Sequence, residues 1–361
     1  MRSTFAPAYS IVNRTARIQR RDAAATLWIA LAALLLLAGH KAVAEPESRR
    51  GIQPLSASES PAGHIRAAEP ADAQKARRLG AAHLTRLTAQ PWLAKWKGSE
   101  LGEISLVEQK KDLAWPTDLP PAWWAKVTNR KGGTGYLAWD SEGKGKLIEF
   151  AFDERLSVNT LHANALNGVP ALQQFAIPQE DGKPMASGCV PTSAASVLGF
   201  WIRHGYPRWR GDAGAEPLQN LAKRIRSRLQ MEAIPDKDGY TDDGMTLAGA
   251  MPEDLALAIQ ADADEHHVPI QSRVRHFRYQ TLRSEIREGR PVLLSCTVRL
   301  PHKPQLSWGH EVAGIGSAIV GGVRFVGIID NFYPVKNSAT IRWIRSDAFD
   351  SMITIRPQAK K

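Results

Sequence analysis

The sequence predicts an α+β fold in which a helical region precedes an antiparallel sheet. Three observations predict it. Apolar residues recur at helical spacing between residues 191 and 288, β-branched and apolar runs follow between residues 291 and 330, and a Gly-Gly pair at 321–322 separates two of these runs. Helices gathered in one part of a chain and strands in another are typical of α+β proteins.

The N-terminus, residues 1–44, has the three parts of a secretory signal. Arginines precede an apolar run from Ala23 to Gly39, and Ala42-Val43-Ala44 follows it. We therefore predict a signal peptide over residues 1–44 and an exported chain, periplasmic or secreted. The alternative is a membrane anchor, because the run is close to the roughly 18 to 20 apolar residues that a span requires. If this segment is not cleaved, it is the only part of the chain that we expect to contact a membrane.

Charge argues against one class of partner. The formal net charge is +11, and loss of residues 1–44 lowers it to about +6. The remaining cations are scattered along the chain without a run of five or six, so we predict no nucleic-acid binding. We also predict no cofactor and no metal site, since the Asp236–Gly244 stretch has its glycine at the fourth position rather than the sixth that a calcium loop needs.

Two segments precede the helical region. Residues 45–80 are rich in Pro, Ser, Ala, Glu and Arg and are predicted to be a disordered linker. Residues 81–166 are predicted to be a small β-containing module with a short helix at 81–90 and strands at 136–139 and 146–152. Its clustered tryptophans favour a core over a ligand-stacking surface. One hypothesis is that this module is an inhibitory pro-segment.

The third segment, residues 167–361, contains the elements of the α+β domain. We expect helices at 191–204, 218–230, 246–267 and 279–288, a short extended segment near 270–277, and strands at 291–300, 310–320 and 323–330.

Cys189 lies between Gly188 and the start of a helix of small residues. The positive end of a helix dipole favours the thiolate form of a cysteine. His310 opens one predicted strand, and Asp330 ends the next. Because a Gly-Gly hairpin turn joins these strands, we expect Asp330 to lie against the imidazole of His310. A thiol, a base and a group that orients the base are what cysteine catalysis requires.

The order of these residues resembles that of the papain-like cysteine peptidases, and most closely the bacteriocin-processing, double-glycine peptidase branch. The resemblance covers about residues 169–350, with His310 about 120 residues after Cys189. The residues that carry it are Gly188-Cys189-x-Pro191-Thr192, Gly289-Arg290-Pro291-Val292, Gly309-His310 and Asp330. It implies a helical lobe that carries the cysteine helix and an antiparallel sheet that carries the histidine and the aspartate.

The resemblance also implies roles and a substrate. Cys189 would be the nucleophile, His310 the general base and Asp330 the orienting carboxylate, acting on a peptide or protein. A glutamine before the cysteine usually serves the oxyanion hole of the family, together with the backbone N–H of the cysteine. We favour Gln179 for this role, because a glycine- and proline-containing loop can fold it back, and Gln174 is its competitor. The family often has glycine after the cysteine, where this chain has Val190.

Three alternatives remain open from the residues. The first is another thiol enzyme, transglutaminase-like or an amidase, and the second is a non-catalytic binding module with the same fold. The third is an envelope protein in which Cys189 and Cys296 form a disulfide, which an exported chain permits. Cys296 lies between Leu294 and Val298 in a predicted strand, so we expect it to be a core residue instead.

Overall fold

The computed structural model describes residues 70–107, 115–152, 158–159, 163–178, 184–210, 217–229, 231–233, 248–300, 303–331 and 341–358. The predicted signal segment, the linker up to residue 69, Gln179 and the Asp236–Gly244 stretch lie outside these residues. Among the described helices, none is both long enough and apolar enough to cross a membrane.

Helix α2 (Pro70–Thr88) begins inside the segment for which the sequence predicted a linker to residue 80. Its buried residues Ala76, Leu84 and Leu87 join the core, and a Cβ at Gly80 would lie 2.8 Å from the Trp139 ring. The helix is rich in charged and polar residues, and packing of its apolar face on the sheet stabilises it.

A 3₁₀ helix and an antiparallel meander follow α2. The elements are η1 (Pro91–Trp96), β1 (Glu100–Leu106), β2 (Trp115–Pro116), β3 (Ala122–Thr128), β4 (Thr134–Asp140) and β5 (Leu147–Phe152). The β4–β5 hairpin confirms the strands predicted at 136–139 and 146–152. Trp96, Trp115 and Trp139 are fully buried, so these tryptophans fill a core as expected.

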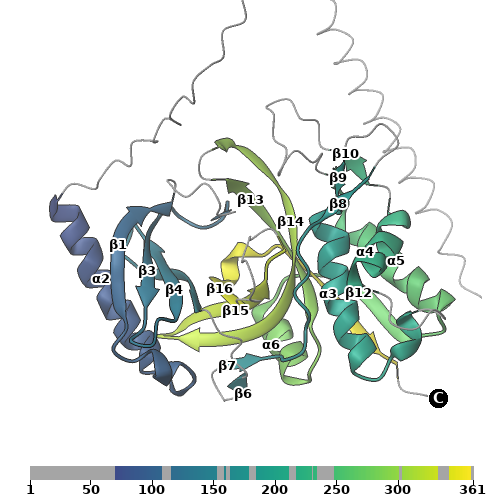
Figure 1. Cartoon of the computed structure of the whole chain (residues 1–361), viewed down its shortest axis with the longest axis horizontal. Coiled ribbons are helices and arrows are strands. Elements are labelled where there is room, and N and C mark those ends of the chain that lie inside the picture. Colours follow the sequence, from purple (N-terminus) through teal and green to yellow (C-terminus); the bar gives the residue numbers. More distant parts are fainter. Residues whose placement is uncertain are drawn as a thin grey trace, which may run out of the picture. The chain divides into compact units, whose positions relative to one another are not determined.

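The central part of the chain is helical. The helices α3 (Cys189–Arg203), α4 (Leu218–Ser227) and α5 (Pro252–Glu265) contact one another and lie together at one end of the sheet (Figure 1). Helix α5 starts at Pro252 rather than at residue 246, because β11 (Ala248–Gly249) pairs with β10 (Glu232–Ala233) just before it. Helix α6 (Tyr279–Arg287) agrees with the prediction.

The remaining strands complete a large sheet. They are β12 (Ile270–His276), β13 (Val292–Leu300), β14 (Lys303–Val320), β15 (Val323–Ile329), β16 (Ile341–Arg345) and β17 (Ser351–Pro357). The main path of the sheet runs β1-β3-β4-β5-β16-β15-β14-β13-β17-β12, with neighbours antiparallel. The mixed helix and antiparallel-sheet class is therefore confirmed, whereas β16 and β17 were not among the predicted strands.

The sheet has a core on each face. One face packs against α2, η1, α3, α4 and α5, and the other packs against α6 and the residues around Trp115 and Phe349. Strand β5 pairs with β16 in a register that places Phe150 opposite Trp343. The strands of residues 81–166 and strands β12 to β17 thus belong to one hydrogen-bonded sheet.

Six short elements complete the described part of the chain. They are β6 (Val158–Asn159), β7 (Ala163–Ala165), β8 (Ala176–Ile177), β9 (Met185–Ala186), η3 (Pro207–Arg210) and η4 (Ser346–Ala348). Among these, β8 and β9 pair with each other just before Cys189.

Candidate functional site

Helix α3 begins at Cys189 because Gly188 turns the chain into it. Gly188 is the N-cap residue with φ 87°, a left-handed conformation that glycine adopts without a steric penalty. The Thr192 hydroxyl donates to the Gly188 carbonyl oxygen at 2.6 Å and lies 2.9 Å from the Ser187 hydroxyl. Cys189 is partly exposed, and as the first helical residue its N–H belongs to the turn that lacks intrahelical acceptors.

The segment before Cys189 is fixed from two sides. Ser187 and Phe175 exchange backbone and hydroxyl hydrogen bonds of 2.8 and 3.0 Å, which extend the β8–β9 pairing toward the helix. From α4, Arg226 Nη1 donates to the carbonyl oxygens of Ser187 at 2.9 Å and Ala186 at 3.2 Å. The thiol is therefore presented from a rigid junction.

The β14–β15 hairpin brings His310 and Asp330 together. Its register pairs Ala313 with Ile329 and Gly314 with Ile328, so alternation places the side chains of His310 and Asp330 on one face. His310 Nε2 lies 2.9 Å from Asp330 Oδ1, and both side chains are about 3% exposed. The predicted juxtaposition of these two residues is confirmed.

The His310 imidazole also forms a side-chain hydrogen bond with Cys189. Since Nε2 faces Asp330, Nδ1 is the nitrogen left for the sulfur. Burial opposes a charge on His310, but the Asp330 carboxylate and the Cys189 contact outweigh it and raise the pKa of His310 to about 10. The imidazole is accordingly protonated at neutral pH, next to a thiol at a helix start.

Asn331 ties the start of α3 to this hairpin. Strand β15 ends at Ile329, opposite Ala313, which leaves the carbonyl oxygen of Glu311 without a partner from β15. Asn331 Nδ2 donates to that oxygen at 3.0 Å and to the Cys189 carbonyl oxygen at 3.1 Å, and Ser193 Oγ donates to Glu311 at 2.8 Å. Sequence reasoning missed Asn331, whose only signal is its place directly after Asp330.

A buried ion pair lies behind Asp330. Arg342 of β16 donates through Nη1 to Asp330 Oδ2, and its Nε and Nη2 lie 2.8 and 3.1 Å from the two carboxylate oxygens of Glu149 in β5. Tyr136 of β4 donates its hydroxyl to Glu149. Burial lowers the pKa of Arg342, but Glu149, Tyr136 and Asp330 outweigh it and hold the pKa above its usual value.

Arg342 and Glu149 were also missed by sequence reasoning. Arg342 is 2% exposed and Glu149 is fully buried, yet each lies within an apolar strand, in "IRWIR" and "LIEFAF". A charged residue with large apolar neighbours on both sides was the available signal, because a charge is rarely buried without a partner.

Of the two glutamines predicted as oxyanion-hole candidates, the structure describes only Gln174. Gln179 lies outside the described residues, whereas Gln174 precedes Phe175 and so falls beside Gly188 in the ladder that pairs Phe175 with Ser187. Gln174 Nε2 donates to Asn331 Oδ1 at 3.0 Å, and its backbone N–H donates to the Asn331 carbonyl oxygen at 3.3 Å. Gln174 is therefore linked through one residue to Cys189.

Cys189 and Cys296 are both free thiols, which contradicts the disulfide alternative. Cys296 is buried in β13 directly opposite His310 in the strand pairing. Burial, followed by the negative charges of Asp330 and Glu311, raises the pKa of the Cys296 thiol well above its ordinary value. Cys296 is thus a protonated core residue, as the sequence predicted for its position.

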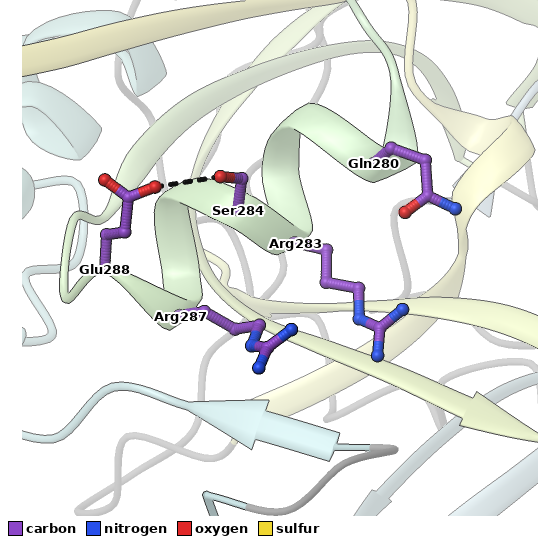
Figure 2. Close-up of a pocket in the computed structure, with 5 residues that line it drawn as sticks. All are labelled: Gln280, Arg283, Ser284, Arg287 and Glu288. Atoms are coloured by element: carbon purple, nitrogen blue, oxygen red, sulfur yellow. Dashed lines mark hydrogen bonds between the residues drawn. The ribbon is translucent and has the colours of Figure 1, made fainter.

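Other sites are sparse in the part of the chain that the structure describes. It contains no group of three side chains suited to a metal ion. A cavity of about 480 Å³ lies along α6, lined by Gln280, Arg283, Ser284, Arg287 and Glu288 (Figure 2). These residues come from one helix and include none of the Cys189, His310 and Asp330 group, and the Ser284 hydroxyl donates to Glu288 at 2.9 Å.

Comparison of the chain with protein-family models and with curated proteins gives no match.

Proposed function

We propose that this chain is an exported papain-like thiol hydrolase, a cysteine peptidase that cleaves peptide bonds through a Cys189 acyl-enzyme. The observation that carries the proposal is the contact of three residues from distant parts of the chain. Cys189 forms a hydrogen bond with His310, and His310 Nε2 lies 2.9 Å from Asp330 Oδ1. A buried imidazolium beside a partly exposed thiol is an arrangement suited to nucleophilic attack. Export is supported by the character of residues 1–44.

The chemistry follows from this arrangement. The reactive form is a Cys189 thiolate beside the His310 imidazolium, which already holds the thiol proton, and the sulfur attacks the carbonyl carbon of the peptide. As the C–N bond breaks, the imidazolium gives its Nδ1 proton to the leaving amine, which produces a thioester. Water next attacks the thioester while His310 takes its proton, the C–S bond breaks and the acid product leaves, and the thiolate and imidazolium are regenerated. Asp330 holds the ring in the orientation in which Nδ1 faces the sulfur.

The tetrahedral oxyanion needs hydrogen-bond donors. The Cys189 N–H at the start of α3 is one, and we assign the side-chain amide of Gln174 as the second, in place of Gln179. The pairing of Phe175 with Ser187 supports this choice, because it brings Gln174 alongside the helix start. An amide nitrogen carries two hydrogens, so Gln174 can keep its 3.0 Å bond to Asn331 while the other hydrogen meets the oxyanion.

The test compares peptide hydrolysis and alkylation in the full chain. A quenched fluorescent peptide library should be hydrolysed by the wild type and by Cys296→Ser, and not by Cys189→Ala. At pH 6, iodoacetamide should label Cys189 faster than the buried Cys296, as read by mass spectrometry of the two cysteine peptides.

Three results bear against the proposal. Hydrolysis that survives Cys189→Ala would remove the thiol mechanism. Equal, slow labelling of both cysteines would remove the reactive pair. Labelling of Cys189 without hydrolysis, together with incorporation of an amine into a glutamine peptide, would assign the chain to transglutaminase-like chemistry instead.

A further inference from the structure

We propose that Glu149 is a positioning residue of this site, acting through Arg342 to set the charge and the orientation of Asp330. The inference rests on the proposed function and extends it. It assigns a part of the catalytic arrangement to the strands of residues 81–166, in which the sequence suggested no catalytic group.

The contacts form one continuous buried line across the sheet. Asp330 bonds His310 through Oδ1 and Arg342 through Oδ2, so both carboxylate oxygens are engaged and the group cannot rotate without losing an ionic bond. Arg342 is held in turn by two bonds of 2.8 and 3.1 Å to Glu149. The fork geometry of a guanidinium between two carboxylates fixes the positions of both.

The net charge of this line also favours the protonated form of His310. Asp330, Arg342 and Glu149 together carry one net negative charge, and a proton on His310 brings the group to neutrality. Without the Glu149 charge, Arg342 would cancel Asp330, and nothing in this line would favour the imidazolium. Since the charged side chains are almost fully excluded from water, these interactions are weakly screened.

Other ionisable groups near the imidazole come from several elements. They are Cys189 at the start of α3, Cys296 in β13 opposite His310, Glu311 next to it in β14, and Tyr136 of β4 beyond Glu149. The test therefore uses Cys189→Ser as its background, so that the thiol does not titrate and the group behind Asp330 decides the result.

The experiment follows the titration of the His310 ring by NMR in the full chain with Cys189→Ser. Adding Glu149→Gln should lower the midpoint of the His310 titration by roughly one pH unit or more, the effect of removing a nearby charge in a buried site. The matched control is Glu285→Gln, a fully buried glutamate of α6 that is ion-paired with Arg290 and Arg356. It should leave the His310 titration unchanged.

A charge-balanced variant separates charge from mere structural support. Glu149→Gln with Arg342→Met removes one anion and one cation, so the His310 midpoint should return toward that of the background. Paired removal is also tolerated better than loss of one partner of a buried ion pair. With Cys189 restored, this double variant should lower kcat with little change in KM, because Asp330 has lost its anchor.

The outcomes distinguish the two proposals. A His310 midpoint that is the same in the Cys189→Ser background with and without Glu149→Gln overturns the positioning role, even where peptides are hydrolysed normally. A midpoint that falls in Glu149→Gln and recovers in the double variant supports it, even where no peptide is hydrolysed and the proposed peptidase activity fails.

Discussion

Glu311 follows His310 in β14 and points to the opposite face of the sheet. Its Oε2 accepts from the Ser295 hydroxyl at 2.5 Å, while Oε1 is buried without a hydrogen-bond partner among the described residues. Burial raises the pKa of Glu311 to about 7, although the Ser295 hydrogen bond and the His310 charge act in the other direction. The folded protein therefore favours the neutral acid.

The raised pKa of Glu311 makes the free energy of unfolding depend on pH. Because the folded-state pKa lies above the ordinary value of 4.5, ionisation destabilises the fold progressively from pH 4.5 to about pH 7. Glu311→Gln removes this penalty, so it should raise the free energy of unfolding more at pH 8 than at pH 5, by about 2 to 3 kcal/mol. Urea unfolding of both proteins at the two pH values measures the difference.

Glu288→Gln is the control for this substitution, because Glu288 is exposed and its pKa is lowered through its contact with Arg290. It should show no gain at pH 8. An effect of Glu311→Gln that is equal at pH 5 and pH 8 would mean that the Glu311 carboxyl titrates normally in the folded protein.

Helix α3 depends on glycine at each end. Gly188 precedes it with φ 87°, and Gly205 follows it with φ 112°. A residue with a Cβ is strained in either conformation, at a cost on the order of 1 to 3 kcal/mol. Only Gly188 adjoins Cys189, so the two positions share a stability cost but differ in their distance from the thiol.

Gly188→Ala should therefore lower stability and also slow alkylation of Cys189, because relief of the strain moves the first turn of α3 away from His310. Gly205→Ala should lower stability by a similar amount and leave the alkylation rate unchanged, since a Cβ there would contact nothing within 4 Å. Thermal unfolding and labelling rates at pH 6 measure both. An equal loss of reactivity in the two variants would show that it reflects stability alone.

The sheet joins the two segments that the sequence separated at residue 166. Strand β5 supplies four paired residues to β16, and Glu149 supplies one of the two carboxylates that compensate the buried Arg342. Aromatic packing crosses the same joint, with Trp92 and Trp343 ring centroids 5.2 Å apart. A pro-segment that leaves on activation would expose β16 as an edge strand and would remove the Glu149 carboxylate from the buried Arg342, which would keep only its contact with Asp330.

We expect residues 167–361 expressed alone to be unfolded or aggregated, for that reason. A full chain cut once near residue 166 should instead keep both fragments together in size-exclusion chromatography and keep its activity. Circular dichroism and proton NMR of the isolated fragment provide the measurement. A folded, active fragment would mean that residues 81–166 are a dispensable module, as the pro-segment hypothesis holds.

The parts of the site that local sequence patterns predicted are those formed over short stretches of chain. Gly188 and the small residues after it indicated the helix start at Cys189, and the Gly-Gly turn set the hairpin that aligns His310 with Asp330. A turn and two strands fix their own register within about 20 residues, so period and turn chemistry were sufficient.

The parts that only the tertiary structure decided come from distant strands. Arg342 meets Glu149 because β16 lies between β5 and β15, an order that no local pattern encodes. Asn331, Gln174 and the burial of Glu311 likewise depend on where α3 contacts the sheet. Local sequence patterns were therefore sufficient to identify the reactive residues. The groups that orient them and set their charge come from strands far apart in the chain, so only the tertiary structure identifies those groups.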